Sequence, residues 1–272
     1  MQEVARAKIN LALHVRGREP DGYHRLETVF AFAEHGDMLR VAEGSALGLE
    51  VEGPMAAGLS SGEDNLVLRA GRALQQRFGV AKGAALTLTK NLPVASGVGG
   101  GSADAAAALR LLNRFWNLGA SEDDLVEIGR PLGADIPACV LSRSCLGSGK
   151  GGQLEPHNLR IYSGAPLLLV NPGVAVSTAD VFRGWGGDDR GPLPADLRKA
   201  RNDLEAPAKA VAPVIGAVLE ALAAAPGATL VRMSGSGATC FALFEGEASR
   251  DAAAAQIASA HPAWWQLASR LG

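Results

Sequence analysis

The chain has 272 residues, of which 47% are hydrophobic and 20% are charged, and its formal net charge is −2. These values are ordinary for a globular enzyme, and the length allows one large domain or two moderate ones. The near-zero charge excludes an electrostatic case for nucleic acid as a partner, because such binding requires a basic face.

Cysteines and apolar runs bear on the cellular compartment. The chain has three cysteines, Cys139, Cys145 and Cys240. Their odd number and the absence of C-x-x-C spacing argue against a disulfide framework and against a cysteine zinc site. The first residues lack the apolar run of a signal peptide, and no stretch approaches about 20 uninterrupted apolar residues. We therefore expect a cytoplasmic protein with no membrane partner and no structural metal.

The opening third of the chain predicts a β-rich region. Residues 4–15 alternate in character, with Ala7 and Ile9 facing one way and Lys8 and Asn10 the other. The polar residues of this strand have a second interpretation, as the solvated face of an edge strand. Further strands are expected over residues 26–33, 38–42 and 47–51.

The middle of the chain contains three predicted helices. Asp64 is a good N-cap for a helix over residues 65–78. A strand over residues 84–89 comes next, and residues 103–116 have strong helical character. Ser121-Glu122-Asp123-Asp124 resembles a capping box that opens another helix.

The second half alternates between strands and helices. A segment rich in Gly, Asp and Pro, residues 184–194, is expected to be the most mobile surface loop. This order of elements predicts an α+β fold, with two lobes and a cleft between them. The expected strands are residues 167–170, 230–233 and 240–244, and the expected helices are residues 204–225, with Pro213 near an early turn, and 248–260.

A glycine-rich segment, residues 92–104, lies between a predicted strand and a predicted helix. It contains four glycines and two serines. Backbone N–H groups can approach an anion closely where no Cβ intervenes, and the helix adds free N–H groups and the positive end of its dipole. Phosphate is therefore the expected ligand.

Spacing excludes two common phosphate-binding motifs. No lysine follows Gly101, as a Walker A loop requires, and Ser102 stands where the Rossmann fingerprint needs its third glycine. The alternative interpretation is a tight strand-to-helix connection without a ligand, although a simple turn rarely needs four glycines in five positions.

Three weaker features have ordinary structural interpretations. The segment Ser234-Gly235-Ser236-Gly237 is as typical of a hairpin as of a binding site. Asp135 is accounted for as the cap of a helix that has Pro137 in its first turn. Tyr23 and His24 follow a Pro-Asp-Gly turn. Each feature is modest alone, and their combination favours a functional site.

Several segments carry a resemblance that spans nearly the whole chain. They are Ala7-Lys8-Ile9-Asn10-Leu11, Asp21-Gly22-Tyr23-His24, Glu63-Asp64-Asn65-Leu66, residues 92–104, Gly133-Ala134-Asp135-Ile136-Pro137, Asn171-Pro172-Gly173-Val174, Arg201-Asn202-Asp203-Leu204 and residues 233–239. In this order they resemble the GHMP kinases, the galactokinase–homoserine–mevalonate–phosphomevalonate kinase superfamily. The Ala-Lys-Ile-Asn opening and the Gly-Tyr-His triplet are most similar to members whose substrate carries a cytidine diphosphate.

The resemblance implies a two-lobed fold and a phosphoryl transfer reaction. The implied N-terminal lobe, residues 1–150, is of the ribosomal-protein-S5 type, and the implied C-terminal lobe, residues 151–272, is ferredoxin-like. The implied cofactors are ATP and Mg²⁺, and the implied acceptor is a tertiary alcohol of a small cytidine-linked substrate. The protein is expected to be a monomer or homodimer.

The resemblance also implies roles for individual residues. Asp135 would accept the proton of the substrate hydroxyl, and Lys8 would orient that hydroxyl and stabilise developing charge. Asn65 and Lys90 would lie near the base and ribose of ATP. The implied contacts to the ATP phosphates come from Pro93, Ser96, Gly97, Val98, Gly99, Gly100, Gly101 and Ser102.

Another group of residues is implied for the cytidine-linked substrate. Tyr23 and Phe182 resemble an aromatic pair that sandwiches cytosine, while His24 would hydrogen-bond its edge. Asn10 and Thr178 would contact the rest of that substrate.

One departure from the family pattern stands at residues 149–153. Members of the family carry an acidic residue after a Gly-x-Gly there, whereas this chain reads Gly-Lys-Gly-Gly-Gln.

Two alternative functions stay open: a family member that acts on another alcohol, such as homoserine or mevalonate, and a non-catalytic binding protein of the same fold.

Overall fold

The computed structural model describes all of residues 1–272, which form two compact units. Helices and strands are both present, which confirms the predicted α+β class. The predicted domain boundary at residue 150 stays a prediction. The first unit consists of Met1–Lys8, His35–Val94 and Gly99–Arg143, and the second unit consists of Ile9–Glu34, Ala95–Val98 and Ser144–Gly272.

Two long strands open the chain and pair with each other: β1 (Gln2–Arg18) and β2 (His24–Ala42). The predicted break between residues 33 and 38 is wrong, because β2 is continuous there. A Cβ on Gly36 would lie 1.9 Å from the carbonyl oxygen of Ala5. The glycine therefore permits a close approach of two strands instead of a turn.

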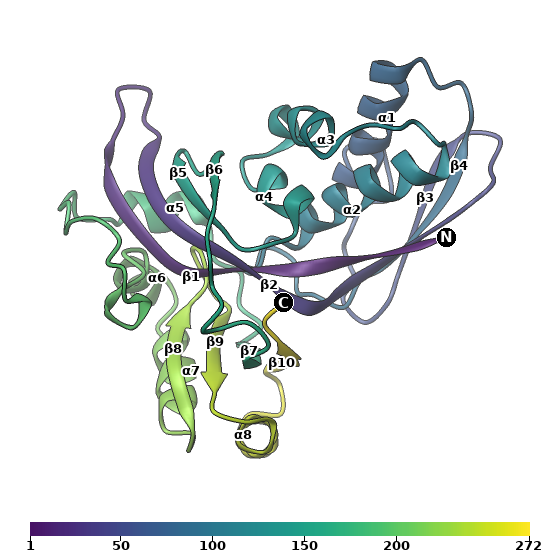
Figure 1. Cartoon of the computed structure of the whole chain (residues 1–272). Coiled ribbons are helices and arrows are strands. Elements are labelled where there is room, and N and C mark those ends of the chain that lie inside the picture. The colour runs from purple at the N-terminus through teal and green to yellow at the C-terminus, as the bar shows by residue number, and fades with distance from the viewer. The chain divides into compact units, whose positions relative to one another are not determined.

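The remaining strands of the first unit extend from the end of β2. Residues Met38–Ala42 pair antiparallel with β4 (Ala84–Thr89), as Figure 1 shows. β4 in turn pairs in parallel with β3 (Leu47–Glu52). The bounds predicted for β4 are confirmed.

Four helices belong to the first unit: α1 (Leu66–Phe78), α2 (Gly100–Phe115), α3 (Glu122–Gly129) and α4 (Ile136–Leu141) (Figure 1). The N-cap of α1 is Asn65, and the prediction of Asp64 is wrong by one residue. The capping box at Ser121 and Asp124 is confirmed. α2 begins three residues before the predicted start, so two of the loop glycines form its first turn.

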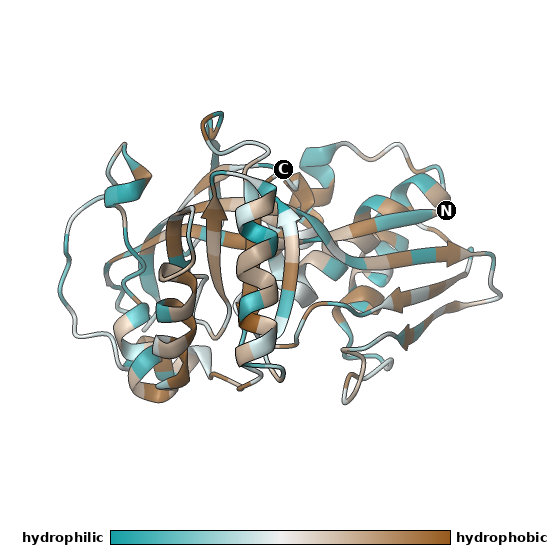
Figure 2. Cartoon of the chain, turned by 90° about the horizontal axis from the view of Figure 1, so that it is seen from below, coloured by the Kyte–Doolittle hydropathy of each residue, from teal (hydrophilic) through white to brown (hydrophobic).

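A four-stranded sheet forms the centre of the second unit, in the order β10-β7-β9-β8. Residues 167–170 and 240–244 of this sheet are buried, and Figure 2 shows brown strands behind α8 (Glu247–Ala260), the helix at the front of that view. Burial of such apolar surface is the main stabilising term in folding. The strands are β7 (Pro166–Asn171), β8 (Ala228–Met233), β9 (Cys240–Phe244) and β10 (Trp265–Arg270).

The helices of the second unit are α5 (Thr178–Arg183), α6 (Glu205–Val211), α7 (Val214–Ala223) and α8 (Glu247–Ala260). The single helix predicted over residues 204–225 is wrong, because Pro213 separates α6 from α7. Proline lacks the N–H that would continue the helix and restricts the residue before it. Ala212 accordingly leaves the helical region, with φ −136° and ψ 87°.

Two further strands were not predicted from the sequence: β5 (Cys145–Gly149) and β6 (Gln153–Pro156). β5 pairs antiparallel with the first half of β2, and β6 pairs with β5.

No helix in the structure combines the length and apolar character that crossing a bilayer requires.

Candidate functional site

Lys8 and Asp135 form an ion pair in the first unit. The Lys8 Nζ atom lies 3.0 Å from Asp135 Oδ2, and the lysine side chain is 4% exposed whereas the aspartate side chain is 36% exposed. β1 supplies the lysine, and the aspartate directly precedes α4. The predicted catalytic pair is therefore brought together, with the carboxylate open to solvent and the ammonium enclosed.

The carboxylate of Asp135 does not cap the helix that follows. Asp135 occupies the N-cap position of α4, but its side chain accepts no capping hydrogen bond there, and Pro137 lies in the first turn. The purely structural interpretation of Asp135 thus lacks the contact that would support it. An exposed carboxylate held beside an ammonium is suited to accept a proton from a bound alcohol.

Gly99 links the glycine-rich segment to Lys8. It is the N-cap of α2, with φ 63°, and no side chain caps this helix. A Cβ on Gly99 would lie 2.9 Å from the Cε atom of Lys8. Only glycine combines this left-handed conformation with space for the lysine.

The start of α2 presents unpaired backbone donors. The first N–H groups of a helix have no intrahelical partner, and here these belong to Gly100, Gly101 and Ser102. They lie at the positive end of a 16-residue helix. Free amides and a helix dipole together favour an anion such as phosphate.

The earlier part of the same segment lies in the second unit, where the second glycine loop contacts it. Thr239 N donates to the carbonyl of Ser96 at 3.0 Å, and Ser234 Oγ donates to the carbonyl of Gly97 at 2.9 Å. A Cβ on Gly97 would lie 2.5 Å from Ser234 O. The loop around residue 235 therefore holds residues 96–97, which the sequence alone did not predict.

The polar residues predicted for the substrate have partners in the second unit. Asn10 is buried, and its Nδ2 donates to Thr28 Oγ1 at 2.8 Å. Thr178 Oγ1 and Ser236 Oγ lie 2.9 Å apart in a hydrogen bond. Thr178 is thus tied to the second glycine loop.

His24 contacts two aromatic rings in the second unit. Its centroid is 4.8 Å from that of Phe182 and 5.4 Å from that of Trp185, with interplanar angles of 32° and 84°. Burial, aided by Arg18, lowers the pKa of His24, so its ring is neutral and can accept as well as donate hydrogen bonds. Trp185 was not predicted, because one tryptophan in a glycine-rich loop carries no motif.

Tyr23 is not part of this ring cluster. Its side chain is largely exposed, and Lys150 Nζ lies 4.3 Å from the centroid of its ring. Lys150 also pairs with Asp21 at 2.5 Å. Lys150 belongs to the Gly-Lys-Gly-Gly-Gln segment that differs from the family pattern. It therefore contacts the turn that carries Tyr23.

The two residues predicted near the nucleotide base have structural partners within the first unit. Asn65 accepts from Val67 N at 2.9 Å as the N-cap of α1. Lys90 is buried, and its ammonium contacts the carboxylates of Asp37 and Asp104. The expected contacts of Asn65 and Lys90 with ATP stay predictions.

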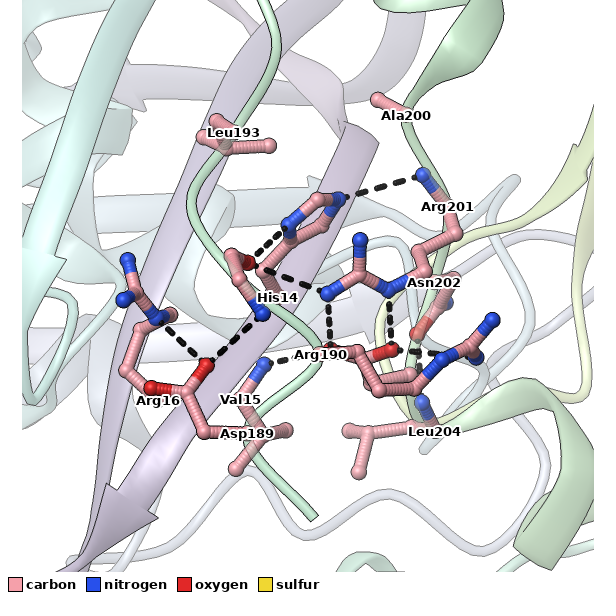
Figure 3. Close-up of polar contacts among 12 residues, drawn as sticks. His14, Val15, Arg16, Asp189, Arg190, Leu193, Ala200, Arg201, Asn202 and Leu204 are labelled. Atoms are coloured by element: carbon pink, nitrogen blue, oxygen red, sulfur yellow. Dashed lines mark hydrogen bonds and ion pairs between the residues drawn. The ribbon is translucent and has the colours of Figure 1, made fainter.

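The segment after α5, predicted to be the most mobile loop, has several polar anchors in the second unit (Figure 3). Asp189 Oδ1 accepts from Arg16 Nε at 2.8 Å. Leu193 N donates to Glu27 Oε2 at 2.8 Å. The carbonyl of Gly191 accepts from the His14 ring at 3.1 Å. These bonds fix the chain that leaves the Phe182 and Trp185 region, and its mobility stays a prediction.

Comparisons with known proteins reveal relatives that span this chain. Two family models match the chain. The model of the GHMP kinases N-terminal domain matches residues 65–143, and the model of the GHMP kinases C-terminal region matches residues 190–263. A protein of Rhizorhabdus wittichii is 54% identical over 276 residues, covering 99% of this chain and 94% of its own length. One of Sphingopyxis alaskensis is 51% identical over 280 residues, covering 100% of this chain and 98% of its own length. Both relatives are named 4-diphosphocytidyl-2-C-methyl-D-erythritol kinase.

Solved structures show the same fold. A crystal structure of 4-(cytidine 5'-diphospho)-2C-methyl-D-erythritol kinase has a TM-score of 0.86 at 34% identity, covering 100% of this chain and 99% of its own. Homoserine kinase from Cytophaga hutchinsonii has a TM-score of 0.70 at 17% identity, covering 100% of this chain and 94% of its own. The second likeness concerns the fold alone.

Proposed function

The chain belongs to the GHMP kinase family, and we propose that it transfers the γ-phosphoryl group of ATP to the 2-hydroxyl of 4-diphosphocytidyl-2-C-methyl-D-erythritol. This reaction is a step of the non-mevalonate route to isoprenoid precursors. The observation that carries the proposal is the Lys8–Asp135 pair, 3.0 Å apart, in a chain 54% identical to a kinase of that name.

The chemistry follows from the needs of phosphoryl transfer, which are positioning and stabilisation of charge on the moving group. Asp135 accepts the proton of the substrate hydroxyl as the oxygen attacks phosphorus. Lys8 lies beside that carboxylate and stabilises the negative charge on the attacking and transferred oxygens. Its burial holds the ammonium in one place, so little reorganisation is needed.

The phosphates of ATP are assigned to the start of α2. The amides of Gly100, Gly101 and Ser102 supply donors there, and Gly99 brings Lys8 alongside. Contacts from Pro93, Ser96, Gly97 and Val98 stay predictions.

Mg²⁺ fits this site as an ion that arrives with the nucleotide. No group of three or more His, Cys, Asp or Glu side chains is placed to enclose an ion. Magnesium in phosphotransferases is held by one or two carboxylates together with substrate phosphates and water. The ATP phosphates and water would hold the ion, which leaves the Asp135 carboxylate for the substrate proton, and the ion would supply neutralisation of phosphate charge when bound.

The second unit carries the residues assigned to the cytidine-linked substrate. The rings of His24, Phe182 and Trp185 support a pocket for a flat heterocycle, because aromatic faces stack on such rings. Asn10 and Thr178 are assigned to the rest of the substrate. We also propose that the protein acts in the cytoplasm as a monomer or homodimer, and its three free, buried cysteines fit a reducing compartment.

A substrate panel tests the proposal. ATP consumption by the purified protein is measured with 4-diphosphocytidyl-2-C-methyl-D-erythritol, homoserine and mevalonate as separate acceptors. We expect turnover with the cytidine compound alone, and Phe182→Ala should raise the KM for it about 3- to 10-fold with little change in the KM for ATP. Preferred turnover of homoserine or mevalonate would assign the chain to another member of the family. ATP binding with no turnover of any acceptor would favour a non-catalytic binding protein.

A further inference from the structure

Three ionisable side chains meet inside the first unit, and we call them the Lys90 cluster: Lys90, Asp37 and Asp104. Their exposed fractions are 2%, 0% and 4%. Lys90 Nζ donates to Asp104 Oδ2 at 2.8 Å and also to Asp37 Oδ2. The lysine directly follows β4, and the aspartates belong to β2 and α2. No member of the cluster is solvated.

The Lys90 cluster lies against the first residue of α2. A Cβ on Gly100 would lie 3.1 Å from Lys90 Nζ and 3.8 Å from Asp37 Oδ2. The charge state of the cluster therefore acts on the helix start to which the ATP phosphates are assigned. Charge this close is weakly screened, because water does not separate it from the helix.

The two aspartates have unequal hydrogen bonds. Asp37 Oδ1 accepts from Asn91 N at 2.5 Å and from Leu92 N at 2.9 Å, and its Oδ2 accepts from Lys90. Asp104 Oδ2 accepts from Lys90, the Asp104 carboxyl group also shares a side-chain hydrogen bond with Asp37, and its Oδ1 is buried without a partner. Asp37 thus has the environment of a carboxylate, whereas Asp104 does not.

The charge balance of the cluster also disfavours an ionised carboxylate at Asp104. One ammonium can neutralise one carboxylate, and a second ionised carboxylate buried without compensation is strongly unfavourable. The charged groups that face Asp104 are Lys90, from the end of β4, and Asp37, from β2. Lys8 and Asp135 contact each other on the side of Gly99.

We propose that Asp104 holds a proton at neutral pH and thereby keeps the Lys90 cluster uncharged beneath the phosphate-binding start of α2. Asp104 is then a positioning residue for ATP, acting through Lys90 and the helix start. This inference rests on the assignment of ATP to that helix.

The electrostatics of the cluster support this assignment. Burial raises the pKa of Asp104 to about 8; the nearby Lys90 opposes the shift and Asp37 adds to it. Burial works to lower the pKa of Lys90, but the two carboxylates raise it above its ordinary value, so the ammonium persists. Above about pH 8 the cluster therefore gains a negative charge, which repels phosphate.

The test is the pH dependence of ATP affinity, measured by calorimetry from roughly pH 7.5 to 9.5, a range in which ATP is already fully ionised. Wild-type protein should lose about tenfold in affinity across this range, the effect of one weakly screened charge near the phosphates. Asp104→Asn keeps the shape of the neutral acid and cannot ionise, so its affinity should not change with pH. Asp123→Asn, an exposed change of the same charge, should follow the wild type.

Three outcomes would overturn the inference: an equal loss in Asp104→Asn, a flat profile in the wild type, or a loss in the wild type that Asp123→Asn abolishes. If Asp104→Asn does not fold, ¹³C NMR of the wild-type aspartate carboxyl groups decides the matter. One of them should titrate near pH 8, and titration of every aspartate in the acid range would refute the proton. A wild type that binds no ATP at any pH would refute the kinase proposal, while the carboxyl titration would still decide this inference.

Discussion

Asp135 combines a buried lysine partner with a carboxylate that is partly open to solvent. Glu122 pairs with Arg143 at the surface, and Asp124 belongs to a capping box. Asp135 instead contacts a buried lysine while its own side chain stays partly open to solvent. A carboxyl group that a bound alcohol can reach meets the geometric requirement for a general base.

Asp135→Asn removes the base and keeps the shape of the side chain. We expect the turnover number to fall by roughly 10²–10⁴-fold, the range associated with a general base, while ATP still binds. Single-turnover kinetics and calorimetry measure the two quantities separately. Asp123→Asn, on the exposed face of α3, is the matched control and should turn over normally. Normal turnover in Asp135→Asn would remove this carboxylate from the mechanism.

At the scale of elements, the junction between the glycine-rich segment and α2 carries most of the proposed nucleotide site. Gly99 has a left-handed backbone and lies against Lys8. Gly119 has a similar φ, 67°, but no atom within 4 Å of the position of a Cβ. Substitutions at Gly99 and Gly119 therefore distinguish the effect of backbone strain, which both share, from the effect of steric contact, which only Gly99 has.

Gly99→Ala and Gly119→Ala should each lower the free energy of unfolding by about 1 kcal/mol, because each places a side chain on a left-handed residue. Only Gly99→Ala should also lower kcat/KM, since its Cβ displaces the Lys8 side chain. Urea unfolding and steady-state kinetics give the two numbers. Equal activity of the two variants would mean that the contact with Lys8 has no catalytic consequence.

A second prediction at this scale concerns His14 of β1, which is fully buried and whose polar contacts Figure 3 shows. Its Nδ1 donates to the carbonyl of Gly191, and its Nε2 accepts from Arg201 N at 3.3 Å. This arrangement requires a neutral ring. Burial is the main cause that lowers the pKa of His14, opposed by the Gly191 carbonyl, Asp203 and Glu27 and reinforced by Arg201.

Because the folded pKa lies below the ordinary value of 6.5, the unfolded chain binds a proton that the folded chain does not. The contribution of His14 to stability is therefore complete above pH 6.5 and is lost as the pH falls through the lowered value. Between about pH 7.5 and 5.5 the urea midpoint should fall further for wild type than for His14→Gln. An identical fall in both proteins would contradict a neutral, buried ring.

For the whole molecule, sequence patterns predicted the elements well wherever local signals were sufficient. β4 and β9 have their predicted bounds, and the capping box at Ser121 opens α3. β2 was divided wrongly, because the polar residues around Gly36 resemble a turn, while the close approach to Ala5 is a tertiary contact. The break at Pro213 was underestimated, although the cost of a proline inside a helix is large.

Local sequence motifs also predicted part of the candidate site. Lys8 and Asp135 were assigned through motifs, and the structure brings them together. The Lys90 cluster and the ring of Trp185 were not found, because both depend on residues that are distant in sequence and carry no motif. The contact between the two glycine loops likewise becomes visible only when the chain is folded.

The most direct test of the account is the identity of the product. Purified protein, ATP, Mg²⁺ and 4-diphosphocytidyl-2-C-methyl-D-erythritol are incubated and followed by ³¹P NMR, with Asp135→Asn in parallel. Wild-type protein should produce one new phosphomonoester resonance coupled to no proton, as expected for a phosphate on a tertiary carbon, and the variant should produce almost none. A phosphomonoester coupled to protons, or equal product from the variant, would contradict transfer to the 2-hydroxyl with Asp135 as the base.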